Sequence, residues 1–500
     1  MNVAMAEKAA ASPRPAPRPA PRAVSSTVWL ACILLLALAV RVYDLGALSL
    51  WRDELFSRFY PRAGEAFMWG PGRSLEPNPP LYYSILHGWI AIAGETDAAV
   101  RLPSVAASVL SVWLVFLTGR DLVGSRAGLL AALMLALSAT GVFYAQEARS
   151  YALEGTGIGL ATLGMARFLH HPTRWQGLAL YALGTSLALY SHLTALLFVA
   201  AANLAMATGL IGARPLLGMP ALLRWVAANL VVAALCLPLA TILLSPQVSG
   251  AYAWIEPLDL ETVLLEAVSL LLGPATWQSS LWFAGAALAG FILIVFRWRP
   301  DRITLIVVVL APSFFTLLLL AVSIWRPMFM LRTLSWLVAP VALVLGAVLA
   351  GQARRATIGV AGILCLALLY QAHRSGTLKE DWRGFIGGLD ARLAPPALVV
   401  LAPDTTPAII AAYAPGVRTI HQVPGDGPGF VDASVIPRVL GVQPITLDAM
   451  EAAIAQGQPV WLITRSDNGD WIKRALARLP PPKERIDPPV RGDPALAFRW

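Results

Sequence analysis

The feature that most constrains this chain is a series of long apolar runs. Stretches of about 18 or more mostly apolar residues recur through the 500 residues, and each is long enough to cross the roughly 30 Å hydrocarbon core of a bilayer as a helix. Hydrophobic residues make up 57% of the chain and charged residues only 13%, whereas soluble domains carry about 25% charged residues. These values exclude an ordinary soluble domain, a disordered chain and a small disulfide scaffold. The sequence therefore predicts an α-helical polytopic membrane protein.

Basic residues predict how these runs are oriented. The net charge is +9, and short breaks between apolar runs carry Arg with almost no acid, at residues 120–126, 170–174, 214–224, 297–302 and 352–355. Basic loops stay in the cytoplasm, so we interpret this charge as a topology signal and predict no nucleic-acid partner. The Pro/Ala/Arg-rich segment 1–26 is then a disordered cytoplasmic tail. Cleavage of a signal peptide after the first apolar run is the alternative for this end.

Residues 79–94 decide the number of spans. This segment begins with Pro-Pro, contains His87 and is shorter than the roughly 20 residues that a span needs. If it crossed the membrane, every Arg-rich break would lie outside the cytoplasm. We therefore predict a helix that lies in the outer interface. About eleven spans result, with the amino terminus inside and the carboxyl terminus outside.

The composition changes after about Tyr370. Short apolar runs at 397–401 and 460–464 are bounded by turn residues and predict buried strands, while 446–456 and 470–479 have a helical pattern. A last apolar run covers 496–500. We predict a transmembrane domain over 27–372 and a small α/β domain outside the cytoplasm over 373–500. The three cysteines (Cys32, Cys236 and Cys365) lie inside apolar runs and have no metal-binding spacing.

Acidic residues gather in the segments predicted to face outward, most densely just after the first apolar run. There Asp53 and Glu54 are adjacent and stand between Arg52 and Arg58, with aromatic residues on both sides. On a helix the two acids point about 100° apart, so they cannot share one role. Ion-coupled transporters instead carry ionisable residues deep in the membrane. The pattern favours a reaction at the outer face over transport, with a merely solvated loop as the alternative.

Several motifs in a fixed order carry a family resemblance. They are LWRDELFS at 50–57, EPNPPLYYSILHGWIAIAG at 76–94, AAVRLPSVAASV at 98–109, FYAQEARSYAL at 143–153, YSHLTAL at 190–196, RPMFMLRTL at 326–334 and EDWRGF at 380–385. Together they resemble the bacterial lipid-linked-sugar glycosyltransferases of the GT-C type. This group is glycosyltransferase family 39-like and includes relatives of protein O-mannosyltransferase and of the aminoarabinose transferase that modifies lipid A.

The resemblance implies a reaction and roles for residues. Such enzymes take a sugar from a polyprenyl-phosphate donor at the outer face of the membrane and invert the anomeric centre, and Asp53 corresponds to the general base. Glu54 is the second candidate catalytic acid. A phosphate leaving group needs cations, which Arg side chains suit. The candidate substrate-binding residues are Arg52, Arg58, Asn78, Tyr82, Gln146, Arg149, Tyr151, His192, Arg326 and Arg332.

Partners, location and alternatives complete the hypothesis. The acceptor is a lipid, a glycan or a protein, and the protein resides in the bacterial inner membrane in contact with the bilayer. We assign no cofactor; a divalent metal is an alternative that is weakened by Asn78, which stands where relatives often carry His. A lipid flippase or polysaccharide exporter, or an O-antigen ligase or polymerase, would be the other function classes.

Overall fold

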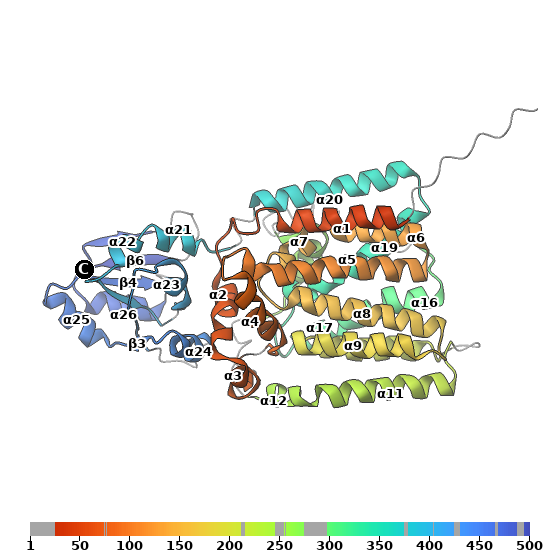
Figure 1. Cartoon of the computed structure of the whole chain (residues 1–500), viewed down its shortest axis with the longest axis horizontal. Coiled ribbons are helices and arrows are strands. Elements are labelled where there is room, and N and C mark those ends of the chain that lie inside the picture. The colour runs from red at the N-terminus through yellow and green to blue at the C-terminus, as the bar shows by residue number, and fades with distance from the viewer. Residues whose placement is uncertain are drawn as a thin grey trace, which may run out of the picture.

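The computed structural model is elongated, with a helical bundle at one end and an α/β sheet at the other (Figure 1). It describes residues 26–74, 76, 78–211, 216–245, 255, 257–274, 298–374, 379–403, 405–424, 431–465, 469–487 and 495–500. The predicted disordered tail lies outside these ranges apart from Ser26.

Most helices of the bundle run along the long axis of the molecule (Figure 1). The helices of the bundle, whatever their direction, are α1 (Ser26–Val42), α5 (Leu102–Leu122), α6 (Ser125–Ala136), α7 (Ala139–Ala145), α8 (Tyr151–His170), α9 (Trp175–Ser191), α10 (Ala195–Thr208), α11 (Met219–Cys236), η4 (Leu237–Leu239), α12 (Ala240–Leu243), α16 (Arg302–Thr304), η6 (Leu305–Leu310), α17 (Ala311–Ser323), α18 (Leu331–Leu334), η7 (Ser335–Leu337), α19 (Val338–Ala350) and α20 (Arg354–Arg374). The short α14 (Leu260–Leu272) packs against α7, α18, α19 and α20.

The described helices include segments with the length and composition of membrane spans. Four continuous segments meet both criteria, at Ala99–Leu122, Met219–Leu243, Arg302–Ser323 and Leu331–Ala350, and the pair α6 and α7 would be a fifth span with a 61° bend. Shorter apolar helices include α1 and α10. The chain is therefore mostly helical with membrane-like helices, and the count of about eleven spans stays a prediction.

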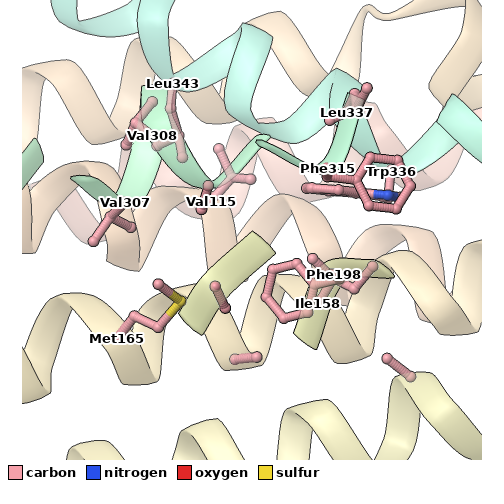
Figure 2. Close-up of a cluster of buried hydrophobic side chains, with 14 of the residues drawn as sticks. Val115, Ile158, Met165, Phe198, Val307, Val308, Phe315, Trp336, Leu337 and Leu343 are labelled. Carbon is pink, nitrogen blue, oxygen red and sulfur yellow. The ribbon is translucent and has the colours of Figure 1, made fainter. Parts of the chain in front are cut away.

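The core of the bundle is made of interlocking apolar side chains. Figure 2 shows Val115, Ile158, Phe198, Phe315 and Trp336, which come from α5, α8, α10, α17 and η7. The Trp336 ring lies edge-on to Phe315 and Phe198, with centroid separations of 4.8 and 5.6 Å. Such offset aromatic contacts add to the stabilisation that apolar burial provides.

Glycines let α8 and α9 approach closely. Gly157 and Gly164 on α8 face Gly184 and Gly177 on α9. A Cβ built at Gly164 would lie 2.4 Å from the backbone nitrogen of Tyr181, so no larger residue fits without moving a helix. Small residues at helix contacts of this kind are typical of membrane bundles.

A buried arginine closes the break between α6 and α7. Arg41, in the last turn of α1, is completely buried and donates to the carbonyl oxygens of Leu135 and Ala136 at 3.2 and 3.1 Å. Its Nε donates to Ser108 Oγ at 2.8 Å. These bonds supply donors to carbonyl groups at the carboxyl end of α6, where the regular helical hydrogen bonding stops.

Short helices cover the end of the bundle that faces the sheet (Figure 1). They are α2 (Arg52–Phe59), η1 (Tyr60–Ala63), α3 (Glu65–Trp69), η2 (Pro71–Ser74), α4 (Leu81–Ala93) and η3 (Ala99–Arg101). The helix predicted within residues 79–94 is therefore confirmed as α4, and its 13 residues are too few for a span. Its position in the membrane interface remains a prediction.

The carboxyl-terminal segment forms a six-stranded sheet in the order β3-β2-β1-β4-β6-β5. Strands β1 to β4 are parallel neighbours, and β6 pairs antiparallel with β4 and β5. The elements are α21 (Trp382–Gly387), α22 (Asp390–Leu393), β1 (Leu398–Leu401), α23 (Ala408–Tyr413), β2 (Ile420–Gln422), α24 (Val431–Val439), β3 (Gln443–Pro444), α25 (Leu447–Ala455), β4 (Val460–Thr464), α26 (Asp470–Arg478), β5 (Glu484–Ile486) and β6 (Leu496–Arg499). Both predicted strands are present as β1 and β4, and they pair with each other. The two predicted helices are present as α25 and α26.

Polar contacts join this sheet domain to the short helices. Ser49 Oγ donates to the carbonyl oxygen of Glu380 at 2.8 Å. The Tyr413 hydroxyl accepts from the Leu50 backbone at 2.8 Å and donates to Asp97 Oδ2 at 3.0 Å. The sheet domain is thus fixed against the segment that contains the predicted catalytic residues.

Candidate active site

Helix α2 places its two adjacent acids in opposite environments, and Glu54 is the buried one. Its Oε1 and Oε2 each accept from the Arg101 guanidinium at 2.7 Å, and Oε1 also accepts from the Ala148 backbone at 2.9 Å. Burial opposes ionisation, but Lys379 and Arg101 outweigh it and lower the pKa of Glu54 to about 2. Glu54 is a fixed internal anion, so this geometry gives no support to the prediction that it acts in catalysis.

Lys379 lies behind the same acid and comes from the segment that leads into the sheet domain. Its Nζ is 3.5 Å from Glu54 Oε2 and 3.5 Å from Glu147 Oε1, and it donates to the carbonyl oxygen of Gln146 at 3.2 Å. Burial raises the pKa of Glu147, and the Lys379 charge opposes this shift. One ammonium group therefore balances two buried carboxyl groups, one from helix α2 and one from the segment between α7 and α8.

Asp53 faces an arginine across the end of the bundle. Its Oδ2 lies 3.3 Å from Arg332 Nη1, and the Asp53 side chain remains 27% exposed. The same Nη1 donates to the Tyr151 hydroxyl at 3.5 Å. The structure thus brings together three predicted site residues from α2, α18 and the start of α8, and it leaves the carboxylate accessible.

Arg149 contacts the backbone of Asp53. It is 7% exposed, and its Nη1 donates to the hydroxyl of Tyr83 at 3.0 Å and to Ser57 Oγ and the Asp53 carbonyl oxygen at 3.4 Å. Its Nη2 is 3.9 Å from Glu76 Oε1, and its Nε has no hydrogen-bond partner among the described residues. Two guanidinium groups therefore stand close to the accessible carboxylate.

Two further predicted residues, Asn78 and Tyr82, contact groups that in turn contact Arg149. Asn78 Nδ2 donates to Glu76 Oε1 at 2.6 Å. The buried Tyr82 hydroxyl is 2.9 Å from Ser104 Oγ, which donates to the carbonyl oxygen of Arg149 at 3.1 Å. Asn78 and Tyr82 therefore belong to the hydrogen-bond network around Arg149. Their hydrogen bonds are made to other protein groups, so these contacts position Arg149 and do not by themselves support a role in substrate binding.

The remaining predicted arginines and Gln146 lie at the margin. Arg58 is 3.4 Å from Glu95, and Gln146 donates to the carbonyl oxygens of Arg41 and Tyr43 at 3.1 and 2.9 Å. Arg52 begins α2 and is half-buried, and Arg326 is exposed in the loop after α17. These contacts of Arg58 and Gln146 do not include Asp53.

His192 directly follows the last residue of α9 and lies beside Tyr151. The two ring centroids are 5.8 Å apart, and Nδ1 of the imidazole is 2.7 Å from Thr194 Oγ1. Burial, together with the charges of Arg149 and Arg332, lowers the pKa of His192 to about 3. The imidazole is therefore neutral at physiological pH.

The sequence reasoning did not assign Lys379 or Glu266 to the site. Glu266, on α14, is buried and accepts from the backbone N–H of Leu331, next to Arg332. Burial raises its pKa to about 7, and the Leu331 N–H and the Arg332 charge oppose this shift. Glu266 could have been found from the sequence, because it is an acidic residue in the middle of an amphipathic helix. No local sequence pattern indicated that Lys379 belongs to the site.

No arrangement for a metal is found in the described part of the chain. No group of three or more His, Cys, Asp or Glu side chains there could hold an ion. His192 has Nδ1 against Thr194, and Glu76 is engaged by Asn78. We therefore assign no metal ligand.

Comparison with known proteins gives a family model and a fold. Residues 77–242 match the model for dolichyl-phosphate-mannose-protein mannosyltransferase. The structure of ArnT from Cupriavidus metallidurans bound to undecaprenyl phosphate is similar over 95% of this chain and 98% of ArnT, with 12% identity and a TM-score of 0.61. The apo state of the same ArnT gives 0.63 with the same coverage and identity. The chain has a GT-C glycosyltransferase fold.

This finding confirms the resemblance that the motifs indicated. At 12% identity the GT-C likeness establishes the architecture alone. The family model covers α4, part of the site and the helices as far as α12, but it includes neither Asp53 nor Arg332. No curated protein sequence matches the chain significantly.

Proposed function

We propose that this protein transfers a sugar from a polyprenyl-phosphate donor to an acceptor hydroxyl at the outer face of a bacterial inner membrane. The observation that carries the proposal is the position of Asp53, an accessible carboxylate at the end of a GT-C bundle, paired with Arg332 and next to Arg149. The amino terminus is then in the cytoplasm and the sheet domain is outside it.

Asp53 serves as the general base. An acceptor hydroxyl is a weak nucleophile at neutral pH, and removal of its proton contributes about 10²–10⁴-fold to the rate. Of the acids in α2, Asp53 is the accessible one, because Glu54 is enclosed by Arg101 and Lys379. One base and one displacement transfer the sugar with inversion.

Arg332 and Arg149 stabilise the leaving phosphate. A guanidinium group donates to two phosphate oxygens at once, and a partly dry site strengthens these bonds. Arg332 is already poised beside Asp53, while Arg149 has a buried Nε without a described partner. The neutral imidazole of His192 lies next to Tyr151 and would donate or accept a single hydrogen bond with the sugar.

The test is sugar transfer from radiolabelled polyprenyl-phosphate sugars in membranes that contain the protein. Asp53→Asn keeps the shape of the side chain but cannot accept a proton, so transfer should fall at least about 100-fold while donor binding persists. Asp53→Glu should keep a trace of activity, because the carboxylate survives but is displaced by one methylene.

The matched control is Glu65→Gln, which changes an exposed acid on α3 at the same end of the bundle. This variant should transfer normally. Normal transfer by Asp53→Asn would refute the role of Asp53. Movement of the lipid across the bilayer without any sugar transfer would support the flippase alternative instead.

A further inference from the structure

A buried carboxyl group near the site has no part in the proposed function. Glu154, in the first turn of α8, is 0% exposed. Its Oε1 accepts from Thr194 Oγ1 at 2.8 Å, and its Oε2 has no hydrogen-bond partner among the described residues. An ionisable residue inside a membrane bundle is costly and usually functional.

Thr194 connects this carboxyl group to His192. Its Oγ1 lies 2.8 Å from Glu154 Oε1 and 2.7 Å from His192 Nδ1, whereas Nδ1 and Oε1 are 3.9 Å apart. The hydroxyl is therefore the bridge between the two ionisable groups. All three residues are buried.

A hydroxyl carries one proton, so the bridge has two complete arrangements. In the first, Nδ1–H of His192 donates to Thr194, whose hydroxyl donates to an ionised Glu154. Nε2 then carries a lone pair, and Nδ1 gives up the 3.3 Å bond that it accepts from the Thr194 backbone N–H. In the second, Glu154 is protonated and donates to Thr194, whose hydroxyl donates to Nδ1, and Nε2 carries the proton. The second arrangement holds one proton more than the first, and His192 is neutral in both.

We propose that His192, Thr194 and Glu154 form a proton relay that removes from the site the proton released by sugar transfer; this rests on the proposed function. A proton arrives at Nε2 and forms an N–H bond there. The Nδ1–H bond breaks and its proton passes to Thr194, whose own proton passes to Oε1 of Glu154. Once the products have left and water has entered the site, the reverse sequence returns the proton through Nε2 to that water, so Asp53 begins each turnover ionised.

The surroundings explain why the proton would not stay on the imidazole. Arg149 and Arg332 both face His192, and with burial they lower its pKa to about 3. The group within ion-pair distance of Glu154 is the His192 imidazole at 3.9 Å, which is neutral in both arrangements, so burial of the carboxylate favours uptake of a proton. A proton is therefore less costly on Glu154 than on His192.

The relay also lies where the reaction occurs. The imidazole is beside Tyr151, whose hydroxyl accepts from Arg332, the partner of Asp53. Since Nδ1 faces Thr194, Nε2 is the nitrogen left for the site. Tyr144 of α7 is the other titratable neighbour, 5.4 Å from Tyr151 between ring centroids. Near this end of α8, Ser111 of α5 hydrogen-bonds to Thr156 and Trp336 of η7 lies against Gly155, and both side chains are uncharged.

The test compares Thr194→Val with Thr194→Ser. Valine has nearly the shape of threonine but no hydroxyl, whereas serine keeps the bridge. We expect kcat for sugar transfer to fall about 100-fold in Thr194→Val with KM for the donor unchanged, and to stay near the wild-type value in Thr194→Ser. The wild-type kcat should rise with pH as Glu154 ionises, and this rise should be absent from Thr194→Val and Glu154→Gln.

A second measurement does not depend on sugar transfer. Infrared difference spectra between acid and alkaline pH should show the carbonyl stretch of a protonated carboxyl group that is missing in Glu154→Gln. Wild-type transfer with equal pH profiles for the valine and serine variants would overturn the relay. If the wild type transferred no sugar, the proposed function would fail, and loss of the infrared band in Glu154→Gln would still show that Glu154 takes up a proton. An unchanged band in Glu154→Gln would overturn the relay whatever the transfer assay shows.

Discussion

At the residue scale, the pair of Glu54 and Arg101 predicts a large stability effect. Both side chains are essentially buried and joined by two bonds of 2.7 Å. Arg101→Met leaves the carboxylate without its main partner, which typically costs about 3–5 kcal/mol of unfolding free energy. Thermal unfolding in detergent should therefore show a much lower midpoint.

Arg62→Met is the matched control, since Arg62 also pairs with an acid at 2.6 Å but is 43% exposed. It should change the unfolding free energy by less than about 1 kcal/mol. Equal destabilisation by the two variants would contradict a special role for burial.

The same pair predicts a response to acid. The pKa of Glu54 is lowered on folding from 4.5 to about 2, so its ionisation stabilises the fold above the unfolded value. This contribution should disappear as the pH falls from about 4.5 towards 2. Glu54→Gln should therefore lose stability relative to wild type at neutral pH, and the difference should shrink through that window in pH-dependent unfolding.

The sequence could predict part of the site because some signals are local. Asp53, Arg149 and Arg332 were found from acids and arginines on outward breaks, and the structure brings them together. The helical angle between Asp53 and Glu54 indicated that the two acids could not share one role. Which one was buried depended on Lys379, which lies 325 residues away, and no local pattern contains that information.

At the element scale, the contact between α8 and α9 can be tested with one methyl group. A Cβ at Gly164 would lie 2.4 Å from the Tyr181 nitrogen and 2.6 Å from the Gly177 oxygen. Gly164→Ala should therefore destabilise the bundle by about 1–3 kcal/mol through overpacking. Gly359→Ala on the exposed part of α20, where nothing lies within 4 Å, is the control and should not lower the unfolding midpoint.

The elements that sequence reasoning missed are mostly short. Strands β1 and β4 were predicted because four or five consecutive apolar residues are bounded by turns. Strands β2, β3 and β5 have only three, two and three residues, and they are strands because a neighbour pairs with them. Local composition cannot reveal a strand that depends on tertiary pairing.

At the scale of the whole molecule, the sheet domain and the short helices share an apolar core. Leu55 and Phe59 of α2 belong to the same buried cluster as Trp382, Ile409 and Val435. A fragment of residues 379–500 should therefore show the circular dichroism of an α/β fold, because a separate core also lies between the sheet and its helices α25 and α26. It should also bind an apolar dye, since the shared face is uncovered. A fragment that folds without dye binding would contradict the shared core.

Topology is the second prediction at this scale. In a cysteine-free background, cysteines at Ser125 and Thr357 should be shielded from an impermeant thiol reagent in intact cells, because both lie beside the Arg-rich breaks. A cysteine at the exposed Gln458, in the sheet domain, should be labelled. Labelling at Ser125 and protection at Gln458 would mean that the whole orientation is reversed.

The bonds of Arg41 set an order of events during biosynthesis. Helix α1 leaves the ribosome first, but the carbonyl group of Ala136 that Arg41 binds is made 95 residues later. Until then the guanidinium must remain among water and lipid headgroups, because hydrocarbon offers it no partner. Helix α1 therefore cannot settle to its final depth as an independent unit. We therefore expect α1 to reach its final position only after α5 and α6 have been made, because Ser108, Leu135 and Ala136 supply the partners of Arg41.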